Sequence, residues 1–92
     1  MADNSLGRIA LFTGSFDPFT IGHKSIVDRG LQIFAKVIVA IGTNNAKQSW
    51  LPLEKRIEAI RSLYAGNPAV EVVTFDTLAV EAARRWGATR IL

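Results

Sequence analysis

The chain has 92 residues, of which 49% are hydrophobic and 21% charged, so it can form one globular domain and has no room for two. Its longest apolar runs, at 9–12 and 37–41, are far shorter than the roughly 18 residues of a membrane-spanning helix. No secretory leader is predicted either, because Asp3 is acidic and no long apolar stretch follows it. We therefore expect a cytoplasmic protein that does not enter a membrane, with residues 1–7 as a flexible N-terminus.

The chain contains no cysteine and a single histidine, which excludes a disulfide framework, a thiolate zinc site and a histidine cluster, so no resident metal is expected. Its net charge is +3, but the basic residues are dispersed along both halves. This dispersal fits small anionic ligands and argues against a nucleic-acid partner. The densest basic group, Arg84, Arg85 and Arg90, is also typical of a solvated helix end.

Short β-branched runs alternate with segments of helical period, an order that predicts βαβ units around a parallel sheet. Strands are expected at 8–13, 36–42, 70–75 and 88–92. The run at 36–42 is almost continuously apolar, as expected of a strand covered by helices on both faces.

Three helices are expected between these strands. The first, 22–34, has a face for burial made of Ile26, Val27, Gly30, Leu31 and Phe34. The second begins at Pro52 and has an apolar stripe made of Leu53, Ile57, Ile60 and Tyr64. The third, 78–86, is expected to be capped by Asp76 or Thr77 and to end at Gly87.

The most economical arrangement is a doubly wound, Rossmann-like α/β sheet of strand order 3-2-1-4. Such sheets bind ligands beyond the carboxyl ends of the strands where the order reverses, here between the first and fourth strands. The fourth strand coincides with the end of the sequence. We therefore expect a single domain over residues 1–92 that is incomplete at its C-terminus.

The loop at 14–23, Gly-Ser-Phe-Asp-Pro-Phe-Thr-Ile-Gly-His, is the most informative stretch. Gly14 would tolerate a positive φ and let a ligand approach the backbone, and Gly22 would admit the chain into the helix without a Cβ. Free amides at the helix start form an anion site, to which Ser15, Thr20 and His23 would add donors.

Each of these residues also has an ordinary structural role open to it. A lone histidine near a helix start is often a surface or capping residue, and Gly-Ser-Phe-Asp-Pro is a plausible turn. The helix dipole disfavours a charged imidazole at His23 whereas a bound phosphate favours it, so its protonation state stays open. Five such residue types at fixed spacing recur by chance on the order of once per million positions. Together they favour a phosphate site.

The pattern Gly-x-Phe-Asp-Pro-x-Thr-x-Gly-His at 14–23 resembles the signature of the nucleotidyltransferase superfamily with the Thr/His-x-Gly-His motif. Within it, the pattern is similar to that of the bacterial phosphopantetheine adenylyltransferases. The resemblance covers residues 8–92, with weaker support from 45–47, 53–56, 70–73 and 87–89. It departs at Gln48, where the family often has a second lysine, and at Pro52, which replaces a hydroxyl N-cap.

The resemblance implies that the phosphate of 4′-phosphopantetheine attacks the α-phosphorus of ATP, giving dephospho-coenzyme A and pyrophosphate, with Mg²⁺ accompanying ATP. It implies that His23 is catalytic and that Ser15, Phe16 and His23 contact ATP. The residues it assigns to phosphopantetheine are Ser15, Lys47, Leu78 and Ala79, and those it assigns to shaping the phosphate site are Gly14, Thr20 and Gly22. It also implies a homo-oligomer, a hexamer of full-length chains.

The sequence leaves alternatives open for two of these residues and for the reaction. Lys47 could be a solvated loop lysine, and Leu78 could serve core packing. A related nucleotidyltransferase could use another acceptor or transfer a cytidylyl group. Alternatively, the chain could be a catalytically incomplete fragment that needs the rest of the domain.

Overall fold

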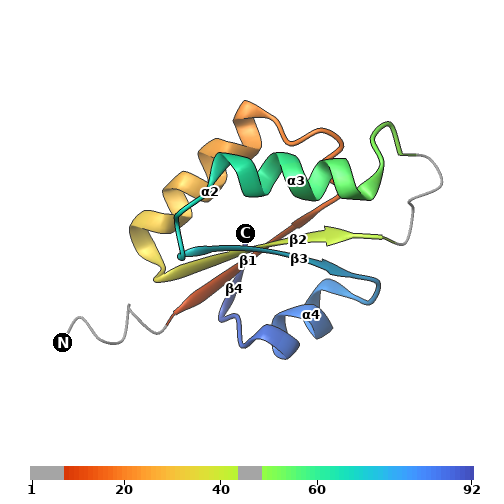
Figure 1. The fold of residues 1–92 in the computed structure, drawn as a ribbon. Coiled ribbons are helices and arrows are strands. Elements are labelled where there is room, and N and C mark those ends of the chain that lie inside the picture. The colour runs from red at the N-terminus through yellow and green to blue at the C-terminus, as the bar shows by residue number, and fades with distance from the viewer. Residues whose placement is uncertain (1–7, 44–48) are drawn as a thin grey trace.

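The computed structural model describes residues 8–43 and 49–92, so the flexible N-terminus predicted for residues 1–7 lies outside the described residues. Strands and helices alternate in the expected order (Figure 1). The strands are β1 (Ile9–Gly14), β2 (Lys36–Gly42), β3 (Val70–Phe75) and β4 (Arg90–Ile91). The helices are α2 (Ile21–Ile33), α3 (Leu53–Leu63) and α4 (Ala79–Trp86).

The strands form one parallel sheet of order β3-β2-β1-β4, which confirms the predicted doubly wound α/β topology. β1 pairs with β2 along its whole length, from Ile9↔Lys36 to Gly14↔Ile41. β4 is shorter than the expected 88–92 and pairs with β1 only through Arg90 and Ile91, both of which are exposed. The strand order therefore reverses between β1 and the edge strand β4.

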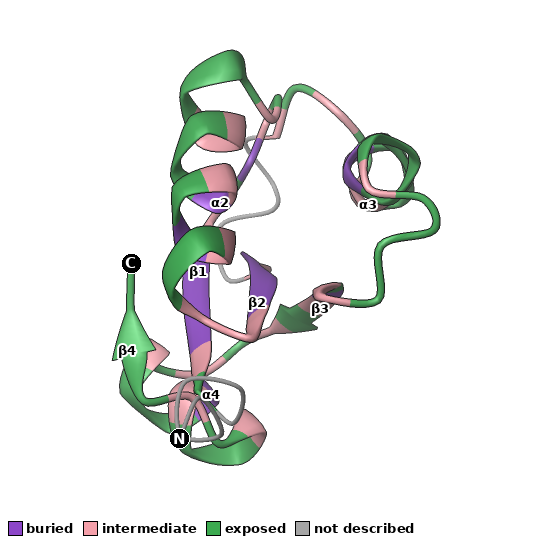
Figure 2. Cartoon of the chain, turned by 90° about the vertical axis from the view of Figure 1, so that its left-hand side faces the viewer, coloured by how far each residue is buried: buried purple, intermediate pink, exposed green. Residues whose placement is uncertain are grey.

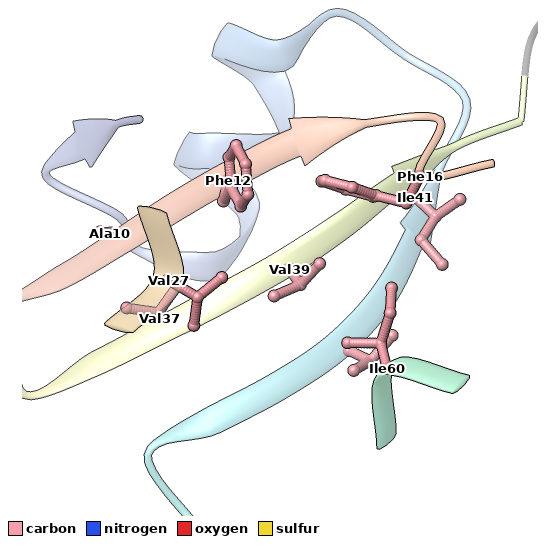
Figure 3. Close-up of a cluster of buried hydrophobic side chains, with 9 residues drawn as sticks. Ala10, Phe12, Phe16, Val27, Val37, Val39, Ile41 and Ile60 are labelled. Carbon is pink, nitrogen blue, oxygen red and sulfur yellow. The ribbon is translucent and has the colours of Figure 1, made fainter. Parts of the chain in front are cut away.

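Helices cover both faces of the sheet, with α2 and α3 on one side and α4 on the other (Figures 1 and 2). Successive residues of β2 point to opposite faces. Val37, Val39 and Ile41 belong to the core under α2 and α3, part of which is drawn in Figure 3, whereas Ile38 and Ala40 belong to the core under α4. The two-sided burial predicted for this strand is confirmed.

Two details of the helices differ from the expectations. Ile26 is 41% exposed, so the buried face of α2 centres on Val27 and Gly30. α4 begins one residue later than expected, after Leu78, which has no side-chain capping bond. The predicted capping by Asp76 or Thr77 is therefore wrong, because both residues precede the capping position.

The predicted end of α4 is confirmed. Gly87 ends this helix in the left-handed conformation, with φ of 70°. None of the helices within residues 8–43 and 49–92 is long and apolar enough to cross a bilayer.

A side-chain network links α2 to Tyr64, the residue that caps the end of α3. The Tyr64 hydroxyl donates to Asp28 Oδ1 at 3.2 Å, and Lys24 Nζ donates to Asp28 Oδ2 at 2.8 Å. The hydrogen bond from Lys24 lowers the pKa of Asp28. Burial, with the adjacent Asp28 charge, raises the pKa of Tyr64 to about 12. The phenol is thus held in its neutral form as a donor.

We expect stability to fall as the pH rises from about 10, the pKa of an unperturbed tyrosine, to about 12. The folded state favours the protonated phenol, so its stabilising effect is complete below the unfolded pKa and is lost as pH passes the folded one. Tyr64 is the single tyrosine of the chain, so the ultraviolet absorbance of tyrosinate reports it alone. A midpoint at the ordinary tyrosine pKa in the folded protein would contradict the network, and Tyr64→Phe is the control without the step.

Candidate active site

The loop predicted to bind phosphate connects the carboxyl end of β1 to the start of α2. It emerges where the strand order reverses, which is where doubly wound sheets bind their ligands. The N–H groups of Ile21 and Gly22 open α2 and have no carbonyl one helical turn earlier within it. No acidic side chain lies in the first turn of α2, so the positive end of its dipole is not neutralised from within the helix. This helix start is suited to an anion.

Thr20 and His23 form a capping box at the start of α2. Thr20 Oγ1 accepts from the His23 amide at 3.3 Å, and His23 Nδ1 accepts from the Thr20 amide at 2.9 Å. Thr20 Oγ1 also lies 3.1 Å from Nδ1. Histidine here takes the place of the Glu or Gln that usually completes such a box. The alternative of a capping histidine is therefore confirmed, and it bears directly on the chemistry.

The capping box assigns the tautomer of His23. A backbone amide can only donate, so Nδ1 in this arrangement is an acceptor, and the proton of the neutral ring lies on Nε2. Nε2 has no hydrogen-bond partner among the described residues. The ring therefore offers an N–H donor to a ligand at the same helix end that attracts anions.

Three phenyl rings surround the imidazole of His23. Phe16 meets it edge-on with centroids 5.0 Å apart, Phe19 lies at 5.4 Å and Phe12 at 6.0 Å. Such aromatic contacts fix the orientation of a ring as well as its position. The hydrogen bond at Nδ1 and the contacts with the three phenyl rings together fix the orientation of the imidazole, so its Nε2 has a defined direction.

Phe16, predicted to contact ATP, is only 2% exposed. Its ring packs on the core with Phe12, on the same side of the sheet as Ile41 (Figure 3). This low exposure applies to the whole residue, backbone included. The Phe16 ring packs edge-on against the imidazole of His23 and supports it.

Gly14 has a different role from the one expected. Its φ is not positive, whereas that of Phe16 is, at 49°. A Cβ at Gly14 would lie 3.1 Å from Phe16 Cζ, closer than nearly all real contacts. Gly14 therefore leaves room for the Phe16 ring, and its tolerance of a positive φ is not used here.

Ser15 and Gly22 both face open space. Ser15 is exposed, as is Gly22. Among the described residues a Cβ at Gly22 would meet only Thr20 Oγ1, at the ordinary distance of 3.6 Å. Nothing in this part of the chain thus requires a glycine at 22. The free space above it is consistent with a ligand that approaches the backbone.

Two charged residues for which the sequence predicted no role fasten the loop. The Asp17 carboxylate accepts from the amides of Trp50 and Leu51, at 2.5 and 2.7 Å. Arg56 is 2% exposed. Its guanidinium donates to Ser15 O at 2.9 Å and to Leu51 O at 3.1 Å. The loop is thereby bound to the first turn of α3 through Arg56 and to the segment before that helix through Asp17.

A signal for Arg56 was present in the sequence. Arg56 lies three residues after Leu53 and four before Ile60, so helical spacing places it on the apolar stripe of α3. A charged residue on such a stripe is rarely buried without partners. Asp17 lay inside the recognised motif, but its partners are more than thirty residues away and no local pattern indicates them.

The predicted phosphopantetheine residues are not gathered at His23 by any contact in the described residues. Lys47 lies outside the described residues, together with its neighbour Gln48. Leu78 is 71% exposed, so core packing is not its role. Ala79 is partly buried at the start of α4. Both follow the carboxyl end of β3, on the same edge of the sheet as the loop.

The residues present do not fit a metal held by the protein itself. No group of three or more histidine, cysteine, aspartate or glutamate side chains capable of holding a metal lies within residues 8–43 and 49–92. The loop's carboxylate, Asp17, already accepts two backbone amides. The donors that point to a ligand here are N–H groups, which suit an anion.

Comparison with known proteins places these features in a family. The curated phosphopantetheine adenylyltransferase of Porphyromonas gingivalis is 50% identical over 85 residues, which cover 92% of this chain and 56% of that protein. The one from Bacteroides thetaiotaomicron is 46% identical over 78 residues, covering 85% of this chain and 52% of that protein. The chain therefore spans about half the length of the curated relatives it matches.

A solved structure shares the fold. The crystal structure of NadR protein in complex with NAD and AMP-PNP superimposes with a TM-score of 0.66 at 22% identity, over 87% of this chain and 26% of that one. The model of the cytidylyltransferase-like family matches residues 11–92, which include β1 from Leu11 onward, the capping box and the three other strands. The chain belongs to the cytidylyltransferase-like family.

Proposed function

We propose that the protein expressed from its whole gene transfers the adenylyl group of ATP to 4′-phosphopantetheine, forming dephospho-coenzyme A and pyrophosphate. The observation that carries this proposal is the capping box that holds His23 at the start of α2 with Nε2–H free to donate. The acceptor is proposed from the similarity to the phosphopantetheine adenylyltransferases of Porphyromonas gingivalis and Bacteroides thetaiotaomicron.

In this reaction an oxygen of the acceptor phosphate forms a bond to the α-phosphorus of ATP. The bond from the α-phosphorus to the oxygen bridging to the β-phosphorus breaks, and pyrophosphate leaves with that electron pair. No protein nucleophile takes part, and negative charge develops on the oxygens around the α-phosphorus. Catalysis therefore depends on positioning and on donors aimed at these oxygens. Nε2–H of His23 and the first N–H groups of α2 are such donors.

Magnesium enters this proposal as part of the nucleotide substrate and not as a resident ion. The side chains assigned to ATP are Ser15, Phe16 and His23, and those assigned to phosphopantetheine are Ser15, Lys47, Leu78 and Ala79. Phe16 is only 2% exposed as a whole residue, so its assigned contact with ATP stays a prediction. The homo-oligomeric state, the cytoplasmic location and the lack of a nucleic-acid partner stay predictions.

A second candidate is a related transfer with another nucleotide, since the matching family model is that of cytidylyltransferase-like proteins. Pyrophosphate release is measured with magnesium ATP and 4′-phosphopantetheine, and then with CTP in place of ATP. We expect release with ATP that requires the acceptor. Two results would favour the second candidate. One is pyrophosphate release with CTP but not with ATP, and the other is release from ATP at an unchanged rate when the acceptor lacks the pantetheine arm.

A further inference from the structure

We propose that Asp17 and Arg56 are positioning residues for His23, and that they act through Phe16. The consequence for the reaction rests on the proposed function, because it assumes that His23 serves adenylyl transfer. The consequence for the imidazole itself rests on geometry alone.

The two residues secure the chain on either side of Phe16. On one side, the Ser15 carbonyl accepts from Arg56 Nη1 at 2.9 Å. On the other, the Asp17 carboxylate accepts from the amides of Trp50 and Leu51. Phe16 is therefore the residue between two fastened neighbours, and both anchors come from the segment 49–56.

Phe16 needs such support because its backbone is in the left-handed region, with φ of 49°. Side chains other than glycine rarely adopt this conformation, and it persists only where the surroundings hold it. The conformation turns the ring under Gly14 and edge-on to His23, with centroids 5.0 Å apart. If the anchors are removed, we expect Phe16 to relax and the imidazole to lose its support.

Arg56 is suited to this role by the shape of its guanidinium. Each of its three nitrogens has a partner: Nη1 the Ser15 carbonyl, Nε the Leu51 carbonyl at 3.1 Å, and Nη2 Ser49 Oγ at 3.2 Å. A lysine ammonium cannot span three acceptors so far apart. Within residues 8–43 and 49–92 the buried guanidinium has no carboxylate partner, so three neutral oxygens meet its charge.

The first test follows the imidazole directly. His23 is the single histidine of the 92-residue sequence, and in the whole protein the ring resonances that disappear in His23→Ala identify it. We expect Asp17→Asn and Arg56→Lys each to shift and broaden these resonances. The matched controls are Asp76→Asn and Arg61→Lys, at exposed positions, which should leave them unchanged.

The second test uses kinetics. We expect each of the two variants to lower kcat by about 10²-fold, because a catalytic group displaced by about 1 Å loses activity on that scale. The KM for ATP should change far less. Because both act on one ring, the double variant should fall little further than either single one.

A purely structural role would lower the Tm but leave the folded variant with wild-type His23 resonances and wild-type kcat. That result would overturn the proposal. Should Arg56→Lys fail to fold, Asp17→Asn decides, since it keeps one acceptor oxygen and the size of the side chain. If the wild-type protein transfers no adenylyl group, the proposed function fails, while the resonances of His23 still decide whether Asp17 and Arg56 position it.

Discussion

Replacement of His23 by glutamate is expected to lower kcat/KM by about 10³-fold while leaving the protein as stable as wild type or slightly more so. Removal of one donor to a developing oxyanion lowers rates by about 10²- to 10³-fold, and a carboxylate also repels the phosphates. Glutamate is the residue that most often completes a capping box, so it can accept from the Thr20 amide in place of Nδ1. Its charge also favours the start of a helix.

The measurement combines steady-state kinetics with a thermal unfolding curve. His23→Ala is the matched variant, because it removes the donor together with the bond from the Thr20 amide to Nδ1, while the His23 amide still donates to Thr20 Oγ1. It should lose activity and about 1 kcal/mol of stability. Wild-type activity in His23→Glu would exclude His23 from the chemistry. A large loss of stability in the same variant would show that the imidazole does more for the fold than complete the cap.

Replacement of Gly22 by alanine is expected to stabilise the fold by up to about 1 kcal/mol and to lower kcat/KM by about 10²-fold. A Cβ at this position meets only Thr20 Oγ1 among the described residues, at 3.6 Å. Alanine should therefore be accommodated in the helix. The same methyl group would occupy the space through which we propose that a phosphate reaches the helix amides.

Gly14→Ala provides the contrast, because its Cβ would lie within 3.4 Å of three atoms of the buried Phe16 ring. We expect this variant to be destabilised by about 1 to 3 kcal/mol, the usual effect of overpacking. Denaturant titrations and kinetics of both variants test the pair. Unchanged kinetics in Gly22→Ala would remove the argument that a ligand approaches this backbone.

Much of the fold followed from local patterns. The alternation of β-branched runs with helical spacing predicted the strands and helices, and the handedness of crossovers then left the order 3-2-1-4. Gly87 indicated the end of α4 because only a residue that tolerates positive φ fits there. The weaker predictions concerned single side chains: Ile26 has helical spacing suited to burial, yet it is 41% exposed among the described residues.

Periodicity and turn chemistry act over a few residues, so the strands, the helices, the sheet topology and the loop that carries Thr20 and His23 could be predicted from local patterns. How that loop is held could not be predicted in this way. Arg56 meets Ser15 and Asp17 meets Leu51 across 41 and 34 positions of the chain, and the burial of Phe16 depends on space beside Gly14. Partners so distant in sequence meet only when α3 packs on the sheet that contains β1. No local sequence pattern indicates which residues this packing brings together.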